Sequence, residues 1–189
     1  MKVSKDLINV PNILSGYRLL SFPFVLYLVL SHQEKLFAGF LIFNLLTDIL
    51  DGLIARRFNL QTEFGARLDS LADDGTYILA ILGVIIFKAE DFAPHLLSFY
   101  IFIGLFLTSV IISLVKFKKM PSLHLYSSKI GGYLQGFFFF ILFAFGFNTP
   151  FYYFMIAWGI LSFMEHIAVQ LLLPEMRSNV KGLYWVLKK

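Results

Sequence analysis

The sequence predicts an all-α polytopic membrane protein with six transmembrane helices. Hydrophobic residues make up 58% of the 189 residues, and the mean hydropathy is +0.76, both above the values usual for a soluble domain. Apolar stretches of roughly 20 residues recur along the chain, and as a helix each can cross a hydrocarbon core about 30 Å thick. A chain of this length is expected to form one domain, residues 1–189.

The chain order of the expected elements follows the breaks in hydropathy. Residues 1–12 form a short amphipathic lead-in suited to the membrane interface, and no small-residue cleavage site marks it as a signal peptide. The tail after Pro174 carries Tyr184 and Trp185 between lysines, which is typical of an interface anchor. The six helices are expected at residues 13–30, 36–58, 63–87, 95–115, 129–147 and 151–173.

Lysine and arginine are distributed unequally between the two sides of the membrane. Six spans place both termini on one side, with the second and fourth loops, and this side carries fourteen of the sixteen basic residues. The other side has only Lys35 and Lys88. Arg18 and Arg67 are counted here as helix-end charges, and twelve remain without them. The positive-inside rule therefore predicts cytoplasmic termini in the cell (inner) membrane, and the net charge of +4 indicates topology rather than nucleic-acid binding.

A polar run interrupts the apolar sequence at residues 48–73. Asp48 and Asp51 are three residues apart, and Asp69 and Asp73 are four apart, so each pair lies on one helix face. The polar segment between them suits a connection that folds the two helices back on each other. Four converging carboxylates are a site for hard divalent cations, which commonly serve phosphates.

A structural role for these aspartates is the alternative. They could cap helices or pair with Arg56, Arg57 and Arg67, and Thr62 is itself expected to cap the third helix. Capping accounts for one carboxylate but not for four. A charged aspartate at the bilayer centre costs about 2.5–3.5 kcal/mol, which favours cations or a wet cavity at this site. The chain has no cysteine, which excludes thiolate metal sites and a cysteine nucleophile.

The polar run resembles the motif of the CDP-alcohol phosphatidyltransferase family (class I), D-x2-D-G-x2-A-R-x8-G-x3-D-x3-D. Every fixed position is present, at Asp48, Asp51, Gly52, Ala55, Arg56, Gly65, Asp69 and Asp73. The resemblance implies an enzyme of phospholipid biosynthesis that transfers a phosphatidyl group from CDP-diacylglycerol to a small hydroxyl acceptor and releases CMP. It also implies a homodimer.

The resemblance also implies roles for individual residues. Asp48, Asp51 and Asp69 would hold two ions, Mg²⁺ or Mn²⁺, and Asp73 would lie near the second ion and act as general base. Gly52, Ala55 and Gly65 would let the nucleotide approach the helix backbones, and Arg56 would donate to phosphate. Asp74 points about 100° away from Asp73 and is expected to be solvated or paired.

The acceptor is less well defined by the sequence. Residues 10–23 resemble phosphatidylglycerophosphate and cardiolipin synthases of this family, whereas residues 63–73 are equally similar to its phosphatidylserine synthases. Glycerol 3-phosphate or a similar polar alcohol is the acceptor we expect. Lys129 resembles a lysine that binds phosphate-bearing acceptors, and a purely topogenic lysine at a helix end is the alternative.

Three further polar residues have open roles. Asn44 lies four residues before Asp48 and is expected to support a ligand carboxylate or to make an interhelical hydrogen bond. Glu165 and His166 lie inside the sixth span, where ionisable groups indicate function. They would orient an acceptor hydroxyl, or pair with Arg18 or Gln135.

Two other functions are compatible with the sequence. A member of the family that uses CDP-choline or CDP-ethanolamine with a diacylglycerol acceptor would carry the same motif. From another class, a cation or proton transporter would also place aspartates in the membrane, but spread along the depth of several helices. Here all four are on two helices beside one loop, which favours the transferase.

Overall fold

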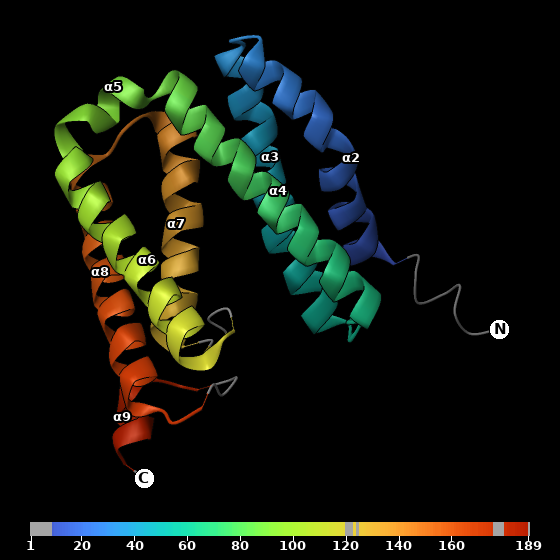
Figure 1. The fold of residues 1–189 in the computed structure, drawn as a ribbon. Coiled ribbons are helices and arrows are strands. Elements are labelled where there is room, and N and C mark those ends of the chain that lie inside the picture. The colour runs from blue at the N-terminus through green and yellow to red at the C-terminus, as the bar shows by residue number, and fades with distance from the viewer. Residues whose placement is uncertain (1–8, 120–122, 124, 176–179, 189) are drawn as a thin grey trace. The chain divides into compact units, whose positions relative to one another are not determined.

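The computed structural model describes residues 9–119, 123, 125–175 and 180–188, and most of the predicted lead-in lies outside them (Figure 1). The described residues contain helices and no strand. Six helical segments are long and apolar enough to cross a membrane. This confirms the predicted fold class, an all-α integral membrane protein. The elements are α2 (Val10–Leu30), α3 (Glu34–Arg57), α4 (Glu63–Phe87), α5 (Ala89–Phe92), η1 (Ala93–His95), α6 (Leu96–Phe117), α7 (Tyr126–Phe145), α8 (Thr149–Leu172) and α9 (Leu183–Leu187).

Two of the spans begin earlier than predicted because a proline lies inside the first turn. In α2 the side chain of Asn9 accepts from the backbone N–H of Asn12, and Pro11 occupies the turn that follows. In α8 Asn148 caps the helix in the same way, ahead of Pro150. The backbone N–H groups of the first turn have no partner inside the helix, so a proline there costs no intrahelical hydrogen bond. Both prolines therefore lie within the first turn of their helix and not in the loop before it.

Two further spans also begin earlier than predicted, α3 at Glu34 rather than residue 36 and α7 at Tyr126 rather than residue 129. Helix α4 has the predicted bounds, Glu63–Phe87, and Thr62 caps it as expected, accepting from the backbone N–H of Gly65 at 2.9 Å. Helix α7 begins at Tyr126 and ends at Phe145, where Gly146 has a φ of 96°. The predicted loop after α4 is occupied by the short helices α5 and η1.

The described chain divides into two compact units. The first contains the residues up to Asp91 together with Phe143–Phe145, and the second contains Phe92–Leu142 and the chain from Gly146 onward. The division does not test whether residues 1–189 form one domain, and the single domain stays a prediction.

In the first unit α2 packs against both α3 and α4 (Figure 1). The side chain of Asn9 donates to the carbonyl of Leu60 at 3.4 Å, which places the start of α2 beside the α3–α4 connection. At the other end Lys88 pairs with Glu34 at 2.7 Å. The end of α3 and the start of α4, which carry the two acidic pairs, therefore meet next to the first turns of α2.

In the second unit α6 packs along α8, and α9 packs against α8. The ring of Phe102 fills the space that a side chain at Gly159 would need. A small apolar core at one end contains Leu123, Leu125, Val169 and Leu173.

Helix packing in the first unit gives a stability prediction at Gly83. A Cβ there would overlap the ring of Phe37 and lie 2.8 Å from Cζ of Phe143, whereas a Cβ at Gly16 would meet nothing within 4 Å. Because overpacking a core costs about 1–3 kcal/mol, Gly83→Ala should lower the thermal unfolding midpoint in detergent. Gly16→Ala, the matched control, should leave it unchanged or raise it, since alanine has the higher helix propensity. Equal midpoints for the two variants would contradict the packing described here.

Candidate metal and phosphate site

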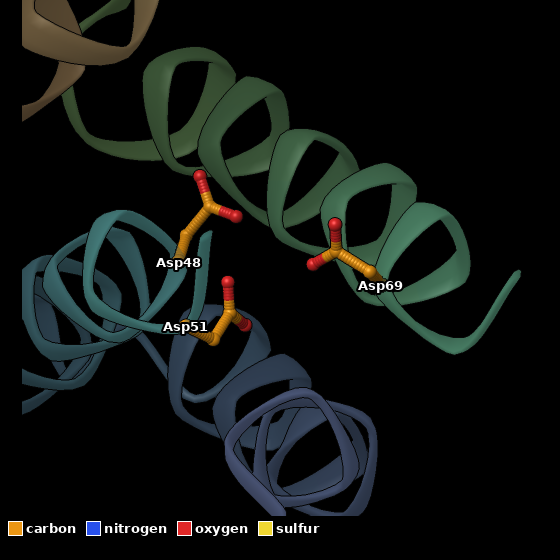
Figure 2. Close-up of side chains that lie close together, drawn as sticks. All are labelled: Asp48, Asp51 and Asp69. Atoms are coloured by element: carbon orange, nitrogen blue, oxygen red, sulfur yellow. The ribbon is translucent and has the colours of Figure 1, made fainter. Parts of the chain in front are cut away.

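The two acidic pairs converge in the first unit. Asp48 and Asp51 come from the last turns of α3, and Asp69 comes from the second turn of α4 (Figure 2). Each of these three residues offers a carboxylate oxygen, and these oxygens all lie within 4.8 Å of one another. The convergence follows from the spacing, since residues three or four apart share a helix face, and from the antiparallel packing of α3 on α4.

An arginine lies at the centre of the four carboxylates. Arg18 Nη1 contacts Asp48 at 2.9 Å and Asp73 at 2.6 Å. Its Nη2 contacts Asp51 at 2.6 Å and Asp69 at 2.7 Å. Each terminal nitrogen thus binds one carboxylate from α3 and one from α4. The Arg18–Asp51 pair is buried on both sides, and removing one partner of such a buried pair typically costs about 3–5 kcal/mol.

The prediction that Arg18 is a helix-end charge was wrong. Arg18 lies inside α2 and contacts the aspartates, so it does more than set topology. Its pairing with Glu165 stays a prediction. Within the second unit, Glu165 accepts from Ser127 Oγ at 2.5 Å and from the backbone N–H of Leu183 at 2.8 Å. One signal was available: Asn12, Ser15 and Arg18 are three residues apart and form a polar stripe on an otherwise apolar span.

The basic residues of the α3–α4 region do not neutralise the aspartates. Arg67 pairs with Glu63 at 2.6 Å on the surface, with both side chains more than three-quarters exposed. Arg56 is exposed and lines a cavity. The alternative in which the aspartates serve as partners for Arg56, Arg57 and Arg67 therefore finds no support in the ion pairs among the described residues.

One side of the acidic cluster is buried and the other is accessible. Asp51 is 3% exposed, and Ser15 Oγ donates to its Oδ2 at 3.1 Å. The side chains of Asp48, Asp69 and Asp73 are 40–45% exposed. Each carboxylate has one oxygen that does not contact Arg18. Accessible carboxylate oxygens from two helices are the donor set that Mg²⁺ or Mn²⁺ prefers, so the residues present fit a divalent ion.

A cavity of about 320 Å³ opens beside the cluster. It brings together the four residues for which nucleotide contacts were predicted, Gly52, Ala55, Arg56 and Gly65, with two of the aspartates. Its wall is formed by Pro11, Asn12, Ser15, Asp51, Gly52, Ala55, Arg56, Leu60, Gln61, Thr62, Gly65, Ala66 and Asp69. Lys129 belongs to the second unit, where its ammonium lies 5.7 Å from the ring centre of Tyr126, and its acceptor role stays a prediction.

The two glycines of the motif have different surroundings. A Cβ at Gly65 would overlap Asn12 Oδ1 and lie 2.9 Å from Thr62 Oγ1, so this glycine serves the close approach of α2 to α4. A Cβ at Gly52 would meet only the Arg56 guanidinium, at 3.5 Å. The space above Gly52 therefore belongs to the cavity.

The remaining polar residues are distributed as follows. Asp74 is exposed, as expected. Asn44 is fully buried, and neither atom of its amide has a hydrogen-bond partner among the described residues, so neither predicted contact is present. His166 Nδ1 lies 2.8 Å from Ser109 Oγ and links α8 to α6; its pairing with Arg18 stays a prediction.

The fold and site define a class of protein: an integral membrane protein with a carboxylate centre and an adjoining cavity suited to a phosphate-bearing ligand. The family model described as CDP-alcohol phosphatidyltransferase matches residues 8–169. The match covers most of the chain, so the protein belongs to this family, as the motif predicted.

Curated relatives give the same family. The chain is 37% identical over 120 residues to the CDP-diacylglycerol–glycerol-3-phosphate 3-phosphatidyltransferase of Aquifex aeolicus, covering 62% of this chain and 66% of the relative. It is 32% identical over 118 residues to a cardiolipin synthase (CMP-forming)/mitochondrial hydrolase fusion protein of Schizosaccharomyces pombe, covering 62% and 19%. The Escherichia coli K12 CDP-diacylglycerol–glycerol-3-phosphate 3-phosphatidyltransferase is 40% identical over 77 residues, covering 39% and 42%. In each case the match spans less than two thirds of the relative. No solved structure matches the chain.

The acidic cluster gives a metal-binding prediction. Asp69→Asn should weaken Mn²⁺ binding by at least about tenfold, since even residues that only support metal ligands typically contribute that much. Asp74→Asn removes the same charge from the same helix at an exposed position and should leave Mn²⁺ binding unchanged. Both affinities can be measured by titration of free Mn²⁺ followed by electron paramagnetic resonance. Equal losses in the two variants would contradict a specific site.

Proposed function

We propose that this protein transfers the phosphatidyl group of CDP-diacylglycerol to glycerol 3-phosphate and releases CMP. The observation that carries the proposal is the gathering of the four motif aspartates beside a 320 Å³ cavity that the other motif residues line. Membership of the family supports the use of a CDP-linked donor. The names of the Aquifex and Escherichia relatives support glycerol 3-phosphate as the acceptor.

We assign two divalent ions, Mg²⁺ or Mn²⁺, to the aspartates. Asp48, Asp51 and Asp69 would hold them, with Asp73 beside the second. Such ions neutralise a diphosphate and the charge that builds on the departing CMP. They also acidify or orient a nearby hydroxyl, which a carboxylate base alone deprotonates poorly.

The residues of the chain divide the remaining tasks. Asp73 accepts the proton of the acceptor hydroxyl as its oxygen bonds to the lipid-side phosphorus of the donor. The bond between that phosphorus and the oxygen bridging to CMP breaks, and CMP leaves with the electron pair. Arg56 donates to a phosphate from its exposed position in the cavity wall, and Gly52 leaves room for the nucleotide.

The proposal includes the cellular setting. The excess of lysine and arginine on one side supports a cell-membrane protein with both termini and the active site in the cytoplasm. We also propose a homodimer, by resemblance to the family. The CDP-choline or CDP-ethanolamine type of reaction is the second candidate within the family, whereas a transporter is disfavoured because all four aspartates contact one guanidinium.

The activity can be tested with purified protein, labelled CDP-diacylglycerol and Mg²⁺ or Mn²⁺. Glycerol 3-phosphate should give CMP and a lipid product, whereas serine, inositol, inositol phosphate and phosphatidylglycerol should give little. Asp73→Asn should lower kcat by about 10²–10⁴-fold, the usual contribution of a general base, and Asp74→Asn should have no effect. Unchanged CMP release in Asp73→Asn with every acceptor would refute the base assignment.

Lys129 gives a separate prediction about the acceptor. If it binds the phosphate of glycerol 3-phosphate, Lys129→Met should raise KM for that acceptor by about 10–100-fold, since a hydrogen bond to a charged group is worth about 1.5–3 kcal/mol. The KM for CDP-diacylglycerol should change little. Lys118→Met, an exposed lysine in the same polar region of the sequence, is the control. A normal acceptor KM in Lys129→Met would leave this lysine with a topological role only.

A further inference from the structure

The charge balance around Arg18 is the starting point. Four carboxylates surround one guanidinium, so the five groups carry a formal charge of −3 when ionised. Arg18 is the one basic residue paired with these aspartates in the part of the chain that the structure describes. Arg67, the nearest basic residue to Asp69 along the chain, is occupied by Glu63.

The hydrogen bonds of Arg18 account for all of its terminal donors. Each terminal nitrogen of a guanidinium carries two N–H groups, and each of the two nitrogens contacts two carboxylates at 2.6–2.9 Å. The remaining nitrogen, Nε, is buried without a hydrogen-bond partner among the described residues. The Arg18 side chain therefore contacts the aspartates through its two terminal nitrogens, Nη1 and Nη2. Each nitrogen bridges a carboxylate of α3 to a carboxylate of α4.

Both terminal nitrogens of Arg18 lie among the carboxylates to which the divalent ions are assigned. A divalent ion held by Asp48, Asp51 and Asp69 would lie close to the guanidinium, since one oxygen of each of these carboxylates contacts Arg18 and their ligand oxygens lie within 4.8 Å of one another. A dication close to the buried guanidinium would be repelled by it, because solvent screens a buried charge poorly.

We propose that Arg18 takes the place of the divalent ions in the metal-free protein and must release carboxylates before the ions bind. Arg18 is then a positioning residue. It holds the four carboxylates of α3 and α4 together when no ion neutralises them, and it lowers the affinity of the site for metal. The inference rests on the metal site of the proposed function.

The proposal distinguishes Arg18 from an arginine that only adds positive charge. Lysine keeps that charge but is a compact point charge with three donors and cannot reproduce the planar fork. If competition for the oxygens limits metal binding, both Arg18→Gln and Arg18→Lys should bind metal more tightly than the unaltered protein. If the charge alone matters, Arg18→Lys should resemble the unaltered protein.

The experiment measures Mn²⁺ binding and thermal stability of the full chain in detergent. All variants are purified with Mg²⁺ and then exchanged into chelator, so that folding does not depend on Arg18. Arg67→Gln is the control, since it removes the same charge from an exposed pair. We expect Arg18→Gln and Arg18→Lys to bind Mn²⁺ at least about tenfold more tightly, about 1.4 kcal/mol, and Arg67→Gln to bind it normally.

Stability gives a second readout. In chelator Arg18→Gln should unfold at a lower temperature than the unaltered protein, and saturating Mn²⁺ should restore most of the difference. An equal loss of stability with and without Mn²⁺ would overturn the proposal in favour of a purely structural arginine. Weaker or unchanged Mn²⁺ binding in both Arg18 variants would also overturn it.

Asp69→Asn in the same assay separates this inference from the proposed function. If Mn²⁺ binding is independent of Asp69, the metal site itself fails. If binding depends on Asp69 but not on Arg18, the metal site stands and only the competition between Arg18 and the ions is refuted.

Discussion

The first unit depends on the contact of one buried guanidinium with four carboxylates. Arg18 comes from α2 and its partners come from α3 and α4, so a single side chain ties three helices together at the end where the cavity opens. Without a cation at this point, the four negatively charged carboxylates would repel one another. The same contact that stabilises the unit therefore sets the geometry of its polar centre.

Most of the fold follows from hydropathy alone. The six spans are present because an apolar stretch of about 20 residues has few alternatives to a membrane-crossing helix. Two of the boundaries that differ do so for a local reason. Pro11 and Pro150 lie in first turns capped by Asn9 and Asn148, and a sequence pattern does not by itself decide whether a proline precedes a helix or begins it.

The candidate site was predictable as far as spacing along single helices allows. Asp48 with Asp51, and Asp69 with Asp73, had to share helix faces, and the short connection brought the faces together. The partner of these carboxylates was not predictable in the same way, because Arg18 is thirty or more residues away along the chain and meets them only through the packing of α2. The buried amide of Asn44 also depends on that packing, and its unpaired state has no counterpart in the sequence pattern.

The position of Arg18 has a consequence for how the chain is made. It lies eight residues beyond Val10, about 12 Å along the axis of the first long helix, and its partners are synthesised later. When this span enters the bilayer it carries the charge of Arg18. On insertion scales a charged residue at the centre of a span raises the free energy of insertion by about 2.5–3.5 kcal/mol. Helix α2 gains its full stability in the membrane only after α3 and α4, which carry the partners of Arg18, have also been inserted. Biogenesis should therefore deliver α2, α3 and α4 to the lipid phase as one group, with the first span retained at the insertion machinery until its acidic neighbours arrive.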